Sequence, residues 1–229
     1  MRKISGFFIS AWLLIPLWSS AQDTTRYPIN DMKGVRVGID LSKLALPFIY
    51  NNRTGFEASL DMHIKGNFFA IAEGGWLKVD LTKSDENNNT IFHYRSNGYY
   101  GKLGIDYNLL KSRRPNSNDL LYAGFRYGMS AFSHEADEII IPQQYWAAVP
   151  SQTIPRADLN AHWIEFLLGV KAEVLKNFYL GVAFRGKFLL SKPKDKKSHS
   201  KAYQIPGYGN GTSTFVIGMN YYVSYNIHF

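Results

Sequence analysis

Phe215-Val-Ile-Gly-Met-Asn-Tyr-Tyr-Val-Ser-Tyr-Asn-Ile-His-Phe229 alternates between two kinds of side chain. Every second residue from Phe215 to Phe229 is apolar or aromatic, whereas the residues between them are mostly small or polar. A period of two is that of a β-strand, because successive side chains point to opposite faces of a sheet. The stretch therefore predicts one long strand with one apolar face.

Seven further segments alternate in the same way, at residues 35–41, 56–63, 68–79, 99–107, 121–129, 164–174 and 180–188. In most of them one face is apolar and the other carries small or charged side chains. The orientation of segment 68–79 stays open, because Glu73 shares one face with apolar residues and Lys78 shares the other. Together with 215–229, these segments predict an all-β chain of eight antiparallel strands.

The links between the predicted strands alternate between two classes. Residues 65–67, 109–120 and 175–177 join strands at one end, and residues 42–54, 80–95, 132–160 and 191–213 join them at the other. Two of the first three are tight turns, whereas the others are all long. Barrels of bacterial outer membranes have short periplasmic turns and long outer loops. The links therefore predict an eight-stranded up-and-down transmembrane β-barrel, or ten strands if residues 44–50 and 139–149 join the sheet.

The first residues have the organisation of a secretory signal peptide. Arg2 and Lys3 precede an apolar run from Ile4 to Trp18, and small residues at 19–21 follow it. The sequence predicts a cleaved signal peptide at 1–21, a short periplasmic segment at 22–33 and a barrel at 34–229. The chain contains no Cys, which excludes a lipid-anchored N-terminal Cys and a disulfide framework.

The direction of the apolar face separates a membrane barrel from a soluble one. A lipocalin-like barrel turns its apolar face inward around a ligand, whereas a membrane barrel turns it toward lipid. Since strand 215–229 is long enough for a membrane span, we predict the second. The lumen is then lined by Arg36, Asp40, Glu57, Asp61, Lys102, Asp106, Arg126, Glu165, Lys171, Glu173, Arg185 and Lys187. Eight strands leave only enough room for side chains, so we predict paired charges and a filled lumen.

The alternating series Tyr221, Val223, Tyr225, Ile227 and Phe229 resembles the C-terminal signal that outer-membrane barrels present to their insertion machinery. With the eight strands and the signal ending in Ser-Ser-Ala-Gln, the chain resembles small outer-membrane β-barrel proteins of the Bacteroidota, including families of unknown function. Its architecture is similar to the OmpX and OmpA barrels. The resemblance implies location in the cell outer membrane and insertion by the β-barrel assembly machinery. It implies no reaction, because no catalytic motif accompanies it.

Two groups of residues have the types that a lipid hydrolase needs. Ser133-His134-Glu135 and Ser198-His199-Ser200 both fall in long outer links. Lipid A deacylases of the outer membrane use a serine, a histidine and an acid in fixed positions. We interpret both groups as solvated loop residues, with a lipid-modifying enzyme as the alternative. The other histidines lack metal-ligand spacing, so we predict no metal site and no cofactor.

The outer links offer surfaces for binding. Phe48 and Tyr50 in one link, and Tyr145 and Trp146 in another, are apolar residues at which a partner protein or a lipid could dock. The net charge of +8 includes five lysines between residues 192 and 201, which would lie near anionic surface lipids. Nucleic acid is a poor partner for a secreted chain. We predict a non-enzymatic outer-membrane barrel that presents its loops to a partner or surface ligand, with a small channel as another alternative.

Overall fold

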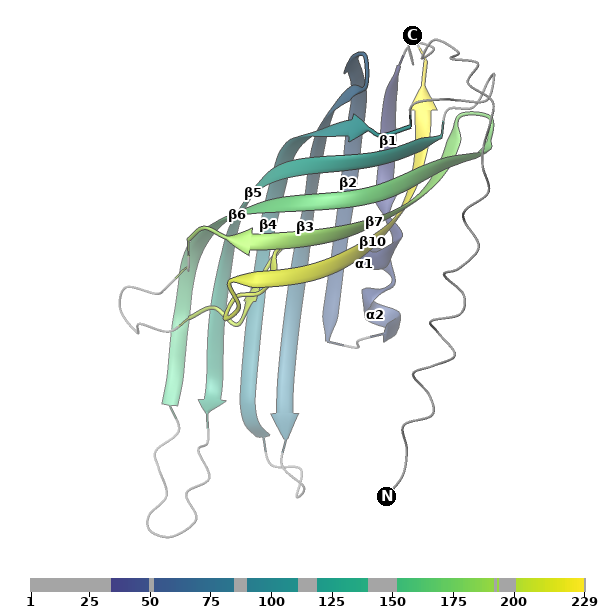
Figure 1. Cartoon of the computed structure of the whole chain (residues 1–229). Helices are drawn as coiled ribbons and strands as arrows, with labels where there is room; N and C mark the ends of the chain where they lie inside the picture. The colour runs from purple at the N-terminus through teal and green to yellow at the C-terminus, as the bar shows by residue number, and fades with distance from the viewer. Residues whose placement is uncertain are drawn as a thin grey trace, which may run out of the picture.

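Eight strands close into a barrel in the computed structural model of the chain (Figure 1). The structure describes residues 34–49, 52–84, 90–110, 119–139, 152–191, 193 and 201–228. The barrel strands are β1 (Val35–Asp40), β2 (Arg53–Lys65), β3 (Phe68–Ser84), β4 (Thr90–Asn108), β5 (Leu120–Ile139), β6 (Gln152–Leu175), β7 (Phe178–Leu189) and β10 (Phe215–Ile227). They pair in the order β1-β10-β7-β6-β5-β4-β3-β2, and β1 closes the ring by pairing antiparallel with both β10 and β2. The predicted eight-stranded barrel is confirmed.

Two parts of the predicted domain organisation lie outside the described residues. These are the signal peptide at 1–21 and the periplasmic segment at 22–33. Both stay predictions.

The link after β1 forms two short helices instead of an extra strand. Helix α1 (Leu41–Leu44) begins after Asp40, whose side chain accepts a hydrogen bond of 2.8 Å from the Ser42 backbone nitrogen. Helix α2 (Leu46–Ile49) follows directly. The Asp40 carboxylate supplies the acceptor that the free backbone N–H groups at a helix start require. The alternative in which residues 44–50 add a strand is therefore wrong.

Strands β3 to β6 are much longer than the others. They contain 17, 19, 20 and 24 residues, whereas β1, β7 and β10 contain 6, 12 and 13. Figure 1 shows them running on beyond the other strands, and we call this extension, at residues 78–84, 90–97, 133–139 and 152–160, the tall wall. The predicted loops at 80–95 and 132–160 are thus too long. Strand pairing continues in them after the apolar period of two has ended.

The second segment that could have added a strand is 139–149. Ile139 is the last residue of β5, and residues 140–149 lie outside the described residues. The barrel closes without them.

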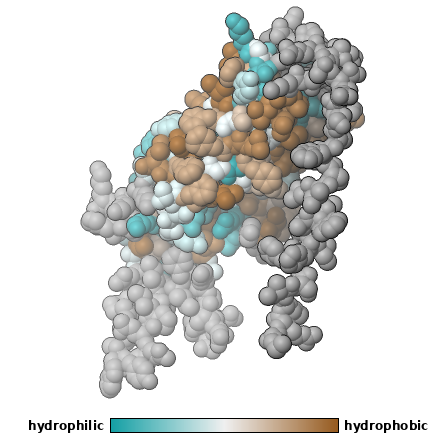
Figure 2. Space-filling view, viewed as in Figure 1, coloured by the Kyte–Doolittle hydropathy of each residue, from teal (hydrophilic) through white to brown (hydrophobic). Residues whose placement is uncertain are grey.

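An apolar belt runs along the outer surface of the barrel, and Figure 2 shows the part of it on one face. Its exposed side chains include Val37, Ile39, Leu60, Met62, Phe68, Leu103, Ile105, Phe125, Met129, Phe166, Leu168, Val170, Leu180, Phe184, Phe188, Phe215, Ile217, Tyr221, Tyr225 and Ile227. Aromatic rings pack across strands there, and the ring centroids of Phe188 and Phe215 lie 4.6 Å apart. The apolar faces of the strands therefore point outward, as the alternation predicted.

The two helices, α1 and α2, have four residues each. Among the described residues, none of them is long and apolar enough to cross a membrane.

The last long link turns back into the barrel. Its strands β8 (Gln204–Ile205) and β9 (Gly209–Asn210) pair as a small hairpin within residues 201–213, which we call the plug. Three plug residues join one buried cluster with lumen-facing side chains; the cluster comprises Tyr100, Phe132, Ala161, Trp163, Leu189, Ala202, Ile205 and Tyr208. The sequence predicted an ordinary outer loop here. The link is drawn inward because its apolar side chains meet an apolar layer of the lumen.

Glycine makes room for the largest lumen side chain. A Cβ atom at Gly128 of β5 would stand 2.3 Å from Cε2 of Trp163, a separation that real atoms do not adopt. Within the plug, Gly207 has a φ of +78° and its backbone lies against the ring of Tyr100. The close approach and the left-handed backbone both require the absence of a side chain.

Candidate functional site

The lumen contains nearly all the charged residues that the sequence placed there. Eleven of the twelve are buried; they are Arg36, Asp40, Glu57, Asp61, Lys102, Asp106, Arg126, Glu165, Lys171, Arg185 and Lys187. Glu173 is the exception, since it is only half-buried. It lies at the turn end of β6, just before a bulge, where its Oε1 accepts a hydrogen bond of 2.8 Å from the Asn177 backbone nitrogen in the turn to β7. Because it pairs with the buried Tyr179 before that bulge, its side chain lies on the inward face, at the end of the lumen.

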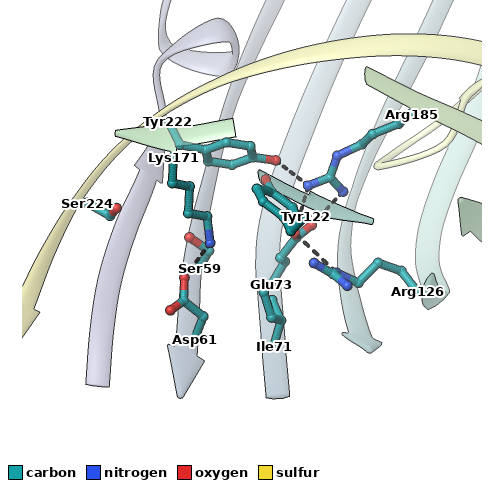
Figure 3. Close-up of a pocket in the computed structure, with 10 residues that line it drawn as sticks. All are labelled: Ser59, Asp61, Ile71, Glu73, Tyr122, Arg126, Lys171, Arg185, Tyr222 and Ser224. Atoms are coloured by element: carbon teal, nitrogen blue, oxygen red, sulfur yellow. Dashed lines mark hydrogen bonds and ion pairs between the residues drawn. The ribbon is translucent and has the colours of Figure 1, made fainter. Parts of the chain in front are cut away.

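Glu73 on β3 is the lumen carboxylate that sequence reasoning did not assign. Its two oxygens accept a forked pair of hydrogen bonds from Arg185, at 2.7 and 2.8 Å. Lys102 Nζ donates to the same carboxylate at 3.0 Å, and Arg126 Nε lies 3.5 Å from it. Figure 3 shows the Glu73 carboxylate between Arg185 and Arg126. Glu73 therefore joins three cations from three different strands.

Further contacts extend this centre toward the other side of the barrel. Arg185 also donates to Glu165 at 2.8 Å and to the hydroxyl of Tyr222. Lys102 donates to Glu57 at 3.0 Å. The Tyr100 hydroxyl donates to the same Glu57 oxygen at 2.7 Å. The charges thus form one connected network rather than isolated pairs.

A second group lies around Asp61. Arg36 Nε donates to one carboxylate oxygen of Asp61 at 2.6 Å, and Lys171 donates to the other. Arg36 also lies over the ring of Tyr179, 5.0 Å from its centroid, and Lys171 lies 5.1 Å from the centroid of Tyr122. Aromatic faces attract cations, and this attraction is stronger where water is excluded. The aromatic rings therefore help to stabilise the two cations.

The buried charges balance. Among the described residues, and with Glu73 included, the lumen holds six buried acids and six buried bases. An unpaired charge inside a barrel would be strongly destabilising, whereas a fully paired set is tolerated. Asp40 is held differently, since it accepts hydrogen bonds from Ser42 and from Asn220.

The packed network leaves almost no free volume. The cavity shown in Figure 3, between Asp61, Glu73 and Arg185, has a volume of about 10 Å³. That volume is roughly the minimum that one water molecule needs. This cavity has no room for a diffusing solute, so the charged side chains fill the lumen at this level.

The plug is tied to the charge network. Lys187 Nζ donates to the carbonyl oxygen of Gly207 in the plug at 2.6 Å and lies 3.8 Å from Glu165 Oε1. The same Glu165 oxygen accepts a hydrogen bond of 2.7 Å from the indole of Trp163, whose ring lies 6.0 Å from that of Tyr208. Two consecutive layers therefore close the lumen, one of ion pairs and one of the plug with its apolar contacts.

The plug also bonds to the tall wall. The hydroxyl of Ser96 donates to the carbonyl oxygen of Gln204 at 3.2 Å, and the Gln204 backbone nitrogen donates to the Tyr94 hydroxyl at 3.2 Å. These bonds satisfy backbone groups that the plug buries. They hold the plug against β4 as well as in the lumen.

Of the two hydrolase candidates, the one within the described residues does not bring its three side chains together. Ser133, His134 and Glu135 lie on β5, so their predicted placement in a loop is wrong. Consecutive strand residues point to opposite faces: the His134 ring is 1% exposed and lies inside, 6.2 Å from the ring of Tyr94. Glu135 instead points outward and lies 3.2 Å from Arg95. The other group, at 198–200, lies outside the described residues.

Metal ligands are not gathered in the described part of the chain. No group of three or more His, Cys, Asp or Glu side chains there has an arrangement that could hold a metal ion.

Only some of the candidate contact residues lie in the described part of the chain. Phe48 on α2 is 90% exposed and its neighbour Ile49 is also exposed. Tyr50, Tyr145 and Trp146 lie outside the described residues. Of the predicted C-terminal insertion signal, Tyr221, Val223, Tyr225 and Ile227 follow one another on the outward face of β10, and Phe229 lies outside the described residues.

A groove of about 230 Å³ crosses the tall wall. It is lined by Lys78, Val79, Arg95, Ser96, Asn97, Ser133, His134, Glu135 and Arg156. Val79, Ser96 and His134 are paired in register across β3, β4 and β5, and their side chains are buried. Their backbone therefore forms the floor of the groove, and the outward residues beside them form its walls.

Comparison with known proteins gives a family and a set of similar barrels. The model of a domain of unknown function (DUF6048) matches residues 4–229. No curated protein matches the chain.

Three solved structures are similar to the chain. A major outer membrane protein from Thermus thermophilus has 12% identity and a TM-score of 0.46, covering 85% of this chain and 98% of that chain. CarO2 from Acinetobacter baumannii has 12% identity and a TM-score of 0.41, with the same two coverages. The outer membrane protease OmpT from Escherichia coli has 10% identity and a TM-score of 0.30, covering 85% of this chain and 93% of that chain.

Proposed function

The chain belongs to the DUF6048 family of unknown function, and we propose from its geometry that it is an integral outer-membrane protein: a sealed, non-enzymatic barrel that presents its outer end to a partner protein. The barrel is the anchor, and α2 with the tall wall is the surface that it presents. The observation that carries the proposal is the combination of an apolar exterior with a lumen filled by balanced charges.

The distribution of residues supports a membrane environment. A soluble barrel buries apolar side chains inside and exposes charges, whereas here the middle of the lumen is charged and the belt outside is apolar. Exposed apolar surface of this extent would drive aggregation in water. In the outer membrane, lipid would cover it. The exposed residues Tyr221, Tyr225 and Ile227 of β10 are then available to the β-barrel assembly machinery during insertion.

The same distribution argues against a channel. Each pathway along the lumen meets the ion-pair network and then the plug. Removing ions from their hydration shells in so narrow a space would need polar groups to replace the water, and those in the network already bond to one another. A sealed lumen leaves the outer end as the place where function resides.

The outer end offers an exposed apolar contact on a short rigid element. Phe48 is 90% exposed and Ile49 is 66% exposed on α2, which is held at the barrel rim through α1 and the Asp40 cap. Aromatic and aliphatic side chains of this kind are typical anchors of protein–protein interfaces. We therefore assign the partner contact to α2, and the partner is a membrane or surface protein with a complementary apolar pocket.

Affinity purification from outer membranes in mild detergent tests this assignment. We expect the wild-type protein to recover a stoichiometric partner, and Phe48→Ser to reduce that recovery roughly tenfold or more, as the loss of a central anchor would. Leu109→Ser is the matched control, because Leu109 is an exposed apolar residue at the other end of the barrel. Both variants should remain folded barrels, since neither side chain is buried.

Equal recovery by wild type and Phe48→Ser would remove α2 as the contact. Recovery of the barrel with no partner from the same membranes would contradict the proposed scaffold role. A chain found outside the outer membrane fraction would contradict the anchoring itself.

A further inference from the structure

The groove across the tall wall lies at the border of the apolar belt. Lys78, Asn97 and Ser133 line the side of the groove that is nearest to the belt. Two residues further along their strands, on the same outward face, come Trp76, Tyr99 and Ala131, which begin the apolar surface. In a barrel embedded through its belt, this is the level of the lipid headgroups.

Cations outnumber acids among the side chains that line the groove, and three further acids, Asp80, Asp137 and Asp158, stand beside it on the same strands. Three of its lining residues are cations, Lys78, Arg95 and Arg156, and Glu135 is its one acid. Arg95 pairs with Glu135 at 3.2 Å and with Asp137 at 2.7 Å. Among the described residues, neither Lys78 nor Arg156 has an ion pair. Lys78 and Arg156 are therefore available to bind an anion. They lie beside Arg95, whose guanidinium is held in place by two carboxylates.

The remaining walls can bind an oxyanion through neutral donors. The Asn97 amide and the Ser133 hydroxyl point outward beside the cations, and the hydroxyl makes a long hydrogen bond of 3.5 Å to the Asn97 carbonyl oxygen. Arginine and lysine with such neutral donors are the usual ligands of phosphate, because each phosphate oxygen accepts several hydrogen bonds. A groove of 230 Å³ is large enough for a phosphorylated headgroup.

An apolar strip continues from the groove along the barrel. Tyr99 is 72% exposed, and Leu103 and Ile105 follow it on the outward face of β4. Met129 and Phe125 lie beside them on the neighbouring strand β5. A ligand with an anionic head in the groove would therefore lay its acyl chains on this strip.

We propose that the groove binds the phosphate of an outer-leaflet lipid, with Lys78, Arg95 and Arg156 as the charged ligands and the strip below Tyr99 as the acyl-chain contact. The proposal rests on the outer-membrane location that we propose above. It concerns a surface separate from the α2 contact, so the two sites have different test variants.

Binding to nanodiscs tests the proposal. The protein is reconstituted in phosphatidylcholine nanodiscs that contain a minor fraction of lipid A, either with its phosphates or dephosphorylated, and bound lipid is counted by native mass spectrometry. We expect the phosphorylated form to be retained, and Lys78→Gln/Arg95→Gln/Arg156→Gln to weaken retention on the order of 10- to 100-fold, since each cation near an anionic lipid surface contributes about a fivefold factor. All three side chains line the groove and are exposed or outward, so the variant should still fold.

The matched control removes three other exposed cations. Lys65→Gln/Lys176→Gln/Lys201→Gln changes the net charge by the same amount, with Lys65 at the end of β2 and Lys176 in the turn before β7, both at the opposite end, and Lys201 at the start of the plug. We expect it to retain lipid A like the wild type. Equal weakening by both triple variants would show general charge attraction and overturn the site.

Two further arms separate the sources of the phosphate. Displacement of the lipid by millimolar inorganic phosphate would assign the groove to a soluble anion and overturn the lipid assignment. Equal retention of dephosphorylated lipid A would overturn the phosphate assignment. Folding of the same samples is followed by the change in their electrophoretic migration on heating, and anchoring by recovery in the outer membrane fraction. A failure of membrane anchoring is therefore seen separately from a failure of lipid binding.

Discussion

Replacing Glu73 by Ala is expected to destabilise the barrel by about 3–5 kcal/mol, the range found when one partner of a buried ion pair is removed. Glu73 accepts the forked pair of hydrogen bonds from Arg185 and one from Lys102, and Arg126 lies beside it. Its removal leaves six buried cations against five buried acids. The free energy of unfolding in lipid or detergent, measured by urea titration, gives the result.

Glu173→Ala is the control for this experiment. It removes the same side chain from the turn end of β6, where the carboxylate takes part in hydrogen bonding in the turn, and should change the free energy of unfolding by about 1 kcal/mol or less. The double variant Glu73→Ala/Arg185→Ala should be less destabilised than the sum of its single variants, because it removes both charges. If Glu73→Ala proves too unstable to titrate, Glu73→Gln, which keeps two polar atoms, supplies the measurement. Equal effects of the changes at 73 and 173 would contradict the network.

Replacing Trp163 by Ala is expected to have a similarly large effect, about 3–5 kcal/mol, as for other buried Trp to Ala changes. Trp163 is fully buried, packs against Tyr208 of the plug and donates to Glu165. The variant loses apolar contact and leaves a cavity between the plug and the ion pairs. The second expected result is therefore release of the plug, seen as faster cleavage by trypsin at Lys201 on intact cells or vesicles.

Trp76→Ala provides the comparison. Trp76 lies on the outward face of β3 and is only half-buried, so its removal should leave the plug protected and change stability less. Unchanged protection of the plug in Trp163→Ala would show that this side chain does not hold it. Faster cleavage in Trp76→Ala as well would attribute the effect to general loosening of the barrel.

The sequence predicted the strands and their faces because a barrel strand reads as a clear period of two wherever one face is apolar and the other charged. This held for β4 and β6, where Lys102 and Glu165 point inward as expected. It failed at β3, because the lumen there is partly apolar. Phe69 and Val79 are buried inside on the same face as Glu73, so the alternation carries no information on which face is the lumen.

The plug and the tall wall could not be predicted for a different reason. The plug residues Gln204 and Tyr208 lie in a stretch rich in Gly, Pro and polar residues, which is typical of loops. Their burial depends on Ser96 and Trp163, each more than forty residues away in sequence. In the wall, both faces of the strands are polar or mixed, so pairing between strands continues with no local signal. Glycine at 128 is visible in the sequence, but its role becomes clear only with the Trp163 ring beside it.

The lumen, the plug and the belt together support the proposal of a barrel that anchors without conducting. The acids and bases fill the middle of the barrel, the plug closes the end toward the tall wall, and the belt faces outward. What remains exposed is the outer end, with Phe48 on α2 and the cationic groove on the wall. The proposed partner and lipid contacts both lie there.

Single-channel recording in planar lipid bilayers tests the sealed lumen most directly. The wild-type protein should insert without steps of ionic conductance, and deletion of plug residues 201–211 should still show none, because the ion-pair layer stays in place. Only the deletion combined with Glu73→Ala/Arg185→Ala should conduct. Regular conductance steps from the wild-type barrel would contradict the account.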